Sequence, residues 1–280
     1  MTITGAPDRG VWLRQFTTTI GTTTAAGTTT AAGIATAAGT GVATGVGAGG
    51  RVVCFPHAGG SAAFFRPLAR SLGGRAELLA VQYPGRLDRF DEPAVSDLRE
   101  LARQVAAQLA ALDDATPTAY LGHSMGALVA FEAALLAPTA PVRLFASAAR
   151  APAAIRIDPA ILVDDRSLEE EVLALGGTSR AVLDNTDLRR MVFPAIRADY
   201  EALRGYVPIP GARVDCPITV LTGTADPRVS VGEARRWRNH TAGGFESRVF
   251  TGGHFYLVPR AREVADVVVA ALHRQAHGDR

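Results

Sequence analysis

The most informative part of this sequence is Tyr120-Leu121-Gly122-His123-Ser124-Met125-Gly126-Ala127. A short apolar segment leads into Gly-x-Ser-x-Gly, and a helix-forming segment follows. This pattern is typical of a nucleophile elbow, a tight strand-to-helix turn that lifts a serine hydroxyl above the edge of a sheet. Side chains two residues before and after the serine would collide with the backbone, so both places need glycine. We therefore predict that Ser124 is a nucleophile and not part of an ordinary surface turn.

The segments on either side of this turn indicate a parallel sheet. Residues 118–121 are short and apolar, and residues 125–137 are rich in Ala and Leu. Strand and helix patterns alternate along the rest of the chain, with strands predicted at 52–55, 78–82, 142–148, 218–222 and 247–250, and helices at 97–111, 234–239 and 259–273. This alternation predicts an α/β fold in which a mostly parallel sheet carries helices on both faces. Ser96 is the predicted N-cap of the first of these helices.

Composition excludes several classes of function. The chain has 280 residues, 48% of them hydrophobic, which is enough for one substantial core. The 29 basic and 27 acidic residues give a net charge of +2 and the basic residues form no run, so we expect no nucleic-acid partner. No apolar stretch is long enough for a membrane span and no secretory signal is recognisable, so we expect no membrane partner. Cys54 and Cys216, the only cysteines, lie in apolar segments, which favours a reducing cytoplasm over a disulfide or zinc site.

The chain divides into parts with different expected roles. Residues 17–50 are almost entirely Thr, Ala and Gly, and the hexamer Thr-Thr-Thr-Ala-Ala-Gly occurs twice in tandem. Such small side chains bury too little surface to offset the entropy of ordering the backbone, so we expect disorder there. A later segment holds three helical patterns without a strand pattern, which predicts a helical lid over the catalytic edge. The expected organisation is an N-terminal arm at 1–16, the low-complexity tract at 17–50, a core at 51–150 and 207–275, the lid at 151–206 and a tail at 276–280.

A serine nucleophile needs a general base, and His254 is the best-placed candidate. It stands in Gly252-Gly253-His254-Phe255, just after a predicted strand, where a base can reach the elbow. The remaining histidines downstream of the serine lie in helical patterns or in the tail: His240, His273 and His277.

The base in turn needs a carboxylate to orient it, and Asp226 is the candidate. Asp226 directly follows the predicted strand at 218–222 and lies between the serine and His254 in the chain, which is the order that this architecture uses. Asp215 precedes the same strand and would therefore lie at the wrong edge of the sheet. The alternative for Asp226 is a simple turn residue before Pro227.

The tetrahedral intermediate of acyl transfer needs at least two N–H donors. The amide of Met125, the residue after the nucleophile, is the first predicted donor. The second should come from the Gly-rich loop after the first core strand, Pro56-His57-Ala58-Gly59-Gly60, and we choose Ala58. His57 precedes the serine in the chain, and we interpret it as shaping this loop and not as the base.

Together these motifs resemble the type II thioesterases, stand-alone α/β-hydrolases that accompany polyketide synthases and nonribosomal peptide synthetases. The resemblance covers residues 51 to about 275, and segment 12–16 resembles the family's usual start. The low-complexity tract departs from the family, which has a short connection there. The matching stretches are Cys54-Phe55-Pro56-His57-Ala58-Gly59-Gly60-Ser61, Gln82-Tyr83-Pro84-Gly85-Arg86, Gly122-His123-Ser124-Met125-Gly126, Leu175-Gly176-Gly177-Thr178, Arg197-Ala198-Asp199-Tyr200, Asp226-Pro227 and Gly252-Gly253-His254-Phe255.

The resemblance implies an α/β-hydrolase fold and a substrate: an acyl group held as a thioester on the phosphopantetheine arm of an acyl or peptidyl carrier protein. The usual task of the family is to remove stalled or aberrant acyl groups. Ser124 would attack the thioester, His254 would take its proton, and Asp226 would hold the imidazole. No metal or bound cofactor is expected, and we expect a monomer in the cytoplasm.

Three other functions remain open. A product-releasing thioesterase would be expected to be fused to a carrier domain. A carboxylesterase would prefer small free esters, and a catalytically silent carrier-binding protein would not need the complete Ser–His–Asp set.

The resemblance also directs attention to the lid and to the rim of the site. Leu183, Val192, Phe193 and Ile196 are the predicted walls of an acyl pocket, with packing inside the lid as the alternative. Carrier domains are commonly acidic, so arginines near the rim are expected to attract them. The candidates are Arg66, Arg86 and Arg89, for which an ordinary solvated surface is the alternative.

Overall fold

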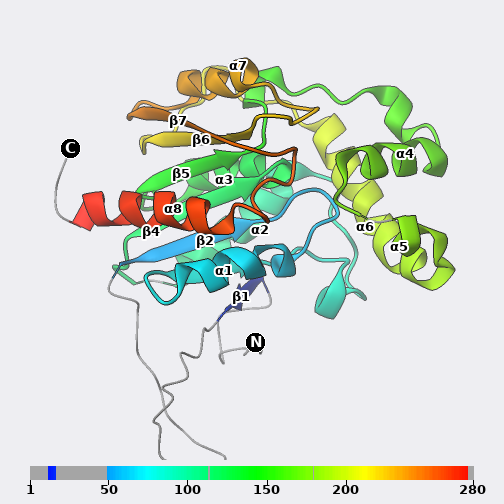
Figure 1. Cartoon of the computed structure of the whole chain (residues 1–280), viewed down its shortest axis with the longest axis horizontal. Helices are drawn as coiled ribbons and strands as arrows, with labels where there is room; N and C mark the ends of the chain where they lie inside the picture. The colour runs from blue at the N-terminus through cyan, green and yellow to red at the C-terminus, as the bar shows by residue number, and fades with distance from the viewer. Residues whose placement is uncertain (1–11, 17–48, 113, 179, 277–280) are drawn as a thin grey trace, which may run out of the picture.

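In the part of the chain that the structure describes, seven strands form one sheet at the centre of the protein (Figure 1). The computed structural model describes residues 12–16, 49–112, 114–178 and 180–276. In order across the sheet the strands are β1, β3, β2, β4, β5, β6 and β7. Their bounds are β1 Leu13–Gln15, β2 Arg51–Phe55, β3 Glu77–Val81, β4 Thr118–His123, β5 Arg143–Ser147, β6 Ile218–Gly223 and β7 Phe245–Phe250.

The pairing confirms the predicted mostly parallel sheet. Strands β2 to β7 pair in parallel, and only β1 runs antiparallel, along β3. The side chains of Trp12, Leu13 and Phe16 around β1 are buried, so this part of the N-terminal arm packs on the body of the protein. The carboxyl ends of parallel strands meet at one edge, which is where polar loop residues can converge.

Helices cover both faces of the sheet because alternate strand residues point to opposite sides. Val52 and Cys54 of β2 belong to the core beneath α1 and α8, whereas Val53 and Phe55 pack with α2 and α3 on the other face (Figure 1). The helices of the body are α1 Arg66–Leu72, α2 Leu98–Ala110, α3 Met125–Leu136, α7 Val231–Ala234 and α8 Ala261–Ala276. The predicted helix at 234–239 is the end of α7 followed by a 3-10 helix, Arg235–His240.

The start of α2 corrects one prediction. The N-cap is Asp97 and not Ser96, because the Asp97 carboxylate accepts hydrogen bonds from the amides of Arg99 and Glu100 at 2.9 and 3.0 Å. Ser and Asp are both good capping residues, so residue type alone does not distinguish the predicted cap from its neighbour.

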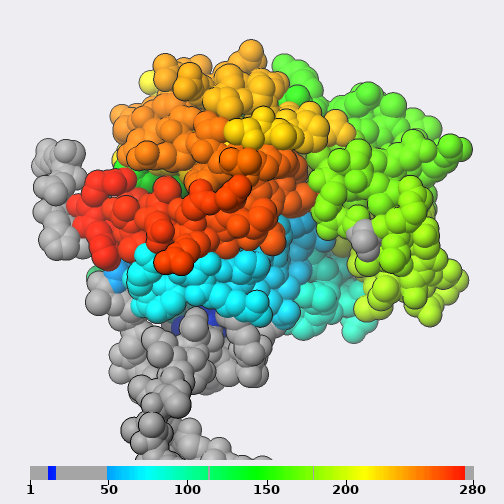
Figure 2. Space-filling view, viewed as in Figure 1, coloured from blue at the N-terminus to red at the C-terminus, as the bar shows by residue number. Residues whose placement is uncertain are grey.

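Residues 151–206, here called the lid segment, contain helices and, among their described residues, no strand. The α-helices are α4 Asp165–Leu175, α5 Arg180–Asp184 and α6 Thr186–Gly205, which confirms the three predicted helical stretches. They form a lobe beside the carboxyl ends of the strands, yellow-green at the right of Figures 1 and 2. Leu168, Val172, Leu183, Phe193, Ile196 and Tyr200 give this lobe a small core of its own.

Two sequence predictions fall outside the described residues. These are the disorder of the low-complexity tract, apart from Gly49 and Gly50, and the place of His277 in the tail. Within the described ranges, the helices are too short or too polar to cross a bilayer.

Candidate active site

The nucleophile elbow forms as the sequence predicts. Ser124 joins β4 directly to α3 with φ 56° and ψ −121°, a conformation that costs a non-glycine residue about 1–3 kcal/mol. A Cβ on Gly122 would lie 2.2 Å from the Gly126 carbonyl oxygen, and a Cβ on Gly126 would lie 2.0 Å from the Phe55 carbonyl oxygen. Only hydrogen fits at either place, so the two glycines permit the turn and the strain is concentrated on the serine.

A histidine–aspartate pair lies at the same edge of the sheet. Nδ1 of His254 is 2.9 Å from Oδ2 and 3.1 Å from Oδ1 of Asp226, and both side chains are nearly inaccessible to solvent. Oδ1 of Asp226 also accepts hydrogen bonds from the amides of Arg228 and Val229 at 2.8 and 3.2 Å. The two backbone amides thus fix the carboxylate of Asp226, and the carboxylate orients the imidazole of His254. Because Nδ1 is occupied by this contact, Nε2 of His254 is the nitrogen that can accept a proton.

Ser124 and His254 line one cavity of about 540 Å³. Asp226 lies behind His254, so the structure brings all three predicted residues to this edge. The other described histidines downstream of Ser124 lie elsewhere: the His240 ring packs on Phe131 and Trp237, and His273 is in α8.

A second serine–histidine contact lies close by but is sealed from the cavity. Nδ1 of His123 is 2.9 Å from Oγ of Ser147, which in turn is 2.7 Å from the Tyr256 hydroxyl. Both His123 and Ser147 are fully buried, and burial lowers the pKa of His123 well below its usual value. A substrate in the cavity cannot reach this hydroxyl, so we interpret the contact as part of the core.

The residues that carry the two predicted oxyanion donors, Met125 and Ala58, line the cavity from neighbouring segments. Met125 is the first residue of α3, so its amide has no carbonyl one turn back in the helix to bind. In the loop after β2, the Gly59 amide donates to Asp199 and the Gly60 amide donates to the His57 carbonyl. Among the described residues the Ala58 amide has no such acceptor, and both Ala58 and Met125 line the cavity.

His57 lines the cavity without taking part in the histidine–aspartate pair. Its ring packs edge-on against Phe64 and Phe255, with centroids 4.6 and 4.8 Å apart. Burial, together with the nearby charges of His254 and Arg86, lowers the pKa of His57 to about 3. The ring is therefore neutral at ordinary pH, which agrees with its predicted role in shaping the loop.

This pKa predicts an acid sensitivity that His57→Gln should reduce. Unfolded His57 titrates near pH 6.5, so between about pH 6.5 and pH 3 the unfolded chain binds a proton that the native chain does not. The free energy of unfolding should therefore fall as the pH falls through this range. When the pH is lowered from 7.5 to 5.5, the free energy of unfolding measured in urea should fall by up to about 1.4 kcal/mol more in the wild type than in the variant. An equal fall in the free energy of unfolding of the two proteins would contradict the lowered pKa of His57.

The lid segment supplies much of the cavity wall, but from residues other than most of those predicted. Of the four predicted walls, Ile196 lines the cavity. The prediction is wrong for Leu183, Val192 and Phe193, which pack in the core of the lid segment itself. Ile196 shares the apolar wall with residues that were not predicted, which include Leu128, Ile155, Ile157, Val172, Leu175, Tyr200 and Leu203. An amphipathic pattern on α4 and α6 marks an apolar face, but it does not tell a cavity wall from a packed core.

The cavity is also lined by charged residues that the sequence reasoning missed. Arg150, Arg156 and Arg228 are among them, and Arg228 forms an ion pair with Glu171 of α4, which lines the cavity too. Arg150 binds Glu233 at 3.0 Å. No motif marked these side chains, which come from three separate segments.

The predicted rim arginines are mostly not at a surface. Arg86 and Arg89 are each only 5% exposed, so neither can attract a partner as a free surface charge. Arg86 pairs with Asp199, and Arg89 pairs with Glu92 and stacks on Trp12. Arg66 is exposed, as that prediction requires. Across the described residues, no group of three or more His, Cys, Asp and Glu side chains is placed to hold a metal ion.

Comparison with known proteins places this geometry in context. A family model described as the thioesterase domain matches residues 50–274. A probable cadicidin biosynthesis thioesterase of Streptomyces griseus is 45% identical over 226 residues, which span 80% of this chain and 62% of that protein. Thioesterase PikA5 of Streptomyces venezuelae is 40% identical over 77% of this chain and 78% of its own length. The structure of BorB, the type II thioesterase from the borrelidin biosynthetic cluster, superposes with a TM-score of 0.72 at 42% identity and covers 79% of this chain and 92% of BorB.

Proposed function

This chain belongs to the thioesterase family, and from that premise we propose that it hydrolyses acyl thioesters on the phosphopantetheine arm of carrier proteins. Its proposed task is the removal of stalled or aberrant acyl groups from polyketide or nonribosomal peptide synthases. One observation carries the chemistry: Ser124 and the His254–Asp226 pair meet at one largely apolar cavity. The similarity to BorB over nearly all of its length favours the stand-alone, editing class.

The first step assigned to this site is acylation of the serine. Ser124 Oγ attacks the thioester carbonyl while Nε2 of His254 takes the hydroxyl proton, and Asp226 stabilises the resulting imidazolium. The amides of Met125 and Ala58 receive the negative charge that develops on the carbonyl oxygen. The positive φ of Ser124 supports this assignment, since it directs the hydroxyl out of the sheet edge.

The second half of the reaction needs only water. The pantetheine sulfur leaves as a thiolate with little help from an acid, because thiols have a pKa near 8.5, and it then takes the proton from His254, which becomes neutral again. A water activated by His254 then hydrolyses the acyl-serine, which releases the carboxylic acid and restores Ser124. The apolar wall formed by residues such as Leu128, Val172 and Ile196 suits the hydrocarbon part of an acyl chain.

A direct comparison of substrates tests this function. The purified protein should release an acyl group from an acyl-carrier protein with a higher kcat/KM than it shows on a small ester of the same acid, measured by intact mass and by chromatography of the acid. A matched acyl-pantetheine thioester without the carrier separates recognition of the carrier from recognition of the thioester. A preference for the free ester would overturn the editing role in favour of a carboxylesterase.

A further inference from the structure

A buried ion pair connects the lid segment to the loop that holds the Ala58 amide. Arg86, in the turn after β3, donates to both carboxylate oxygens of Asp199 in α6, at 2.7 and 3.0 Å. The exposed fractions of the two side chains are 6% and 0%. Such pairs contribute little net stability, because the cost of removing two charges from water offsets their attraction. A role other than stability therefore has to account for the pair.

Both members of the pair bind the loop directly. Oδ2 of Asp199 accepts a hydrogen bond from the Gly59 amide at 2.7 Å. Nη1 of Arg86 donates to the Gly60 carbonyl at 3.1 Å. The Gly59 amide belongs to the peptide unit that follows Ala58, so fixing it also restricts the orientation of the Ala58 amide one residue earlier.

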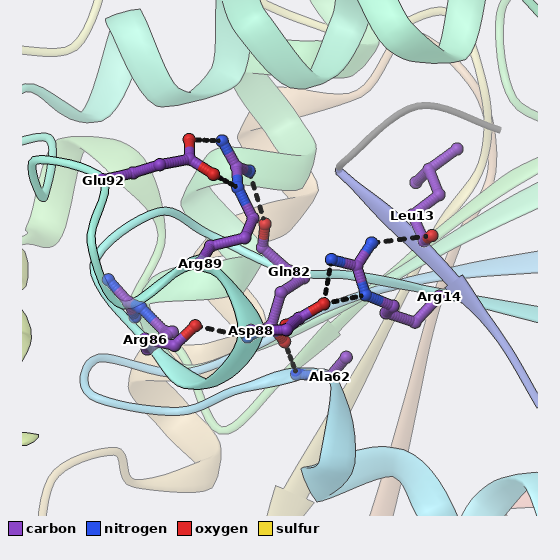
Figure 3. A network of polar contacts seen from close by, with 8 residues as sticks. All are labelled: Leu13, Arg14, Ala62, Gln82, Arg86, Asp88, Arg89 and Glu92. Carbon is purple, nitrogen blue, oxygen red and sulfur yellow. Dashed lines mark hydrogen bonds and ion pairs between the residues drawn. The ribbon is translucent and has the colours of Figure 1, made fainter. Parts of the chain in front are cut away.

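The arginine itself is held in place by the body of the protein (Figure 3). The Gln82 side-chain amide donates to the Arg86 carbonyl at 3.0 Å, and its oxygen accepts from the Ala62 amide at 2.9 Å. Nε of Arg86 donates to the Pro84 carbonyl. The contact chain therefore runs from the end of β3, through Arg86 and Asp199, to the loop.

Helix α6 also contacts the loop directly, through Ile196. Gly59 has φ +73°, and a Cβ there would lie 2.5 Å from Cγ1 of Ile196. Ile196 and Asp199 are three residues apart, on one face of α6. A shift of α6 would therefore move the carboxylate and the loop together.

We propose that the Arg86–Asp199 pair positions the Ala58 amide as an oxyanion donor and makes that position depend on helix α6. The proposal rests on the proposed serine thioesterase function. Arg86 and Asp199 do not touch the reacting atoms and act through Gly59 and Gly60. They should matter more for binding the tetrahedral intermediate than for binding the ground state, because the donor is used fully only when charge develops.

The test is Asp199→Asn, which keeps the size of the side chain and removes its charge. A misplaced donor should lower kcat on acyl-carrier protein about 100-fold and change KM less than about threefold. An alkyl boronic acid, which forms a tetrahedral adduct with the serine, should bind at least about 10-fold more weakly, whereas the matching carboxylic acid should bind as to the wild type. Asp165→Asn is the matched control, since it breaks an exposed ion pair between Arg197 of α6 and α4 without touching the loop.

A second variant covers the case in which Asp199→Asn does not fold. Arg86→Met combined with Asp199→Leu replaces the buried pair by apolar side chains, an exchange that proteins often tolerate. It should keep its thermal transition and show the same selective loss of boronate binding. Wild-type boronate affinity and kcat in either folded variant would overturn the proposal. Absent carrier-thioester turnover in the wild type would instead refute the proposed function, and the boronate comparison would still test the positioning.

Discussion

Replacing Ser124 by alanine is expected to lower the rate of acyl release by about 10⁴- to 10⁶-fold. The hydroxyl is the only protein group in the proposed reaction that forms a bond to the acyl carbon, so its loss removes the acyl-serine intermediate. The fold should survive, since alanine is smaller and the flanking glycines that permit the turn are kept. Acyl-carrier protein should still bind, which fluorescence anisotropy with a labelled carrier can measure beside intact-mass turnover.

The buried serine nearby supplies the control for this experiment. Ser147→Ala removes the hydroxyl that contacts His123 and Tyr256 but does not line the cavity. It should keep turnover within a few-fold of the wild type and lose some stability from the unpaired partners. A large loss in Ser147→Ala together with retained turnover in Ser124→Ala would refute the assignment of the nucleophile.

Asp226→Asn is expected to lower kcat by about 10⁴-fold. The carboxylate accepts the Nδ1 proton of His254, which leaves Nε2 free to take the proton of the serine. An amide in its place can stabilise the wrong tautomer and cannot balance the imidazolium charge. Asparagine keeps an oxygen for the amides of Arg228 and Val229, so the turn should remain and the effect should fall on kcat and not on folding.

A second aspartate near the same strand makes the comparison specific. Asp215 precedes β6, at the opposite edge of the sheet, so Asp215→Asn should leave kcat unchanged. Both variants should be compared with the wild type by steady-state turnover and by thermal unfolding. Near-normal kcat in a folded Asp226→Asn variant would mean that another group orients His254.

The parts of the site that the sequence predicted depend on short-range patterns. Ser124, Asp226 and His254 lie one to four residues after the end of a recognisable strand, and parallel strands bring their carboxyl ends together. The turn at Ser124 was predictable from steric demands within five residues. The prediction of exposed rim arginines failed for Arg86 and Arg89 for the opposite reason, because their burial depends on long-range contacts. From the sequence alone, a charged residue in a loop is predicted to be exposed. The partner of buried Arg86 is Asp199, which lies 113 residues further along the chain.

The sequence was therefore enough to predict the order and type of the helices and strands and the edge of the sheet at which the site lies. It was also enough to predict the three side chains proposed to perform the reaction. Each of these predictions follows from local backbone geometry and from the periodicity of apolar residues. The packing of distant segments determined which face of the lid helices lines the cavity, with Ile196 at the cavity and Phe193 packed away from it. It also decided that Arg86 and Asp199 meet beneath the Ala58 loop. These are choices between equally apolar or equally charged positions, and they depend on how distant segments pack against one another.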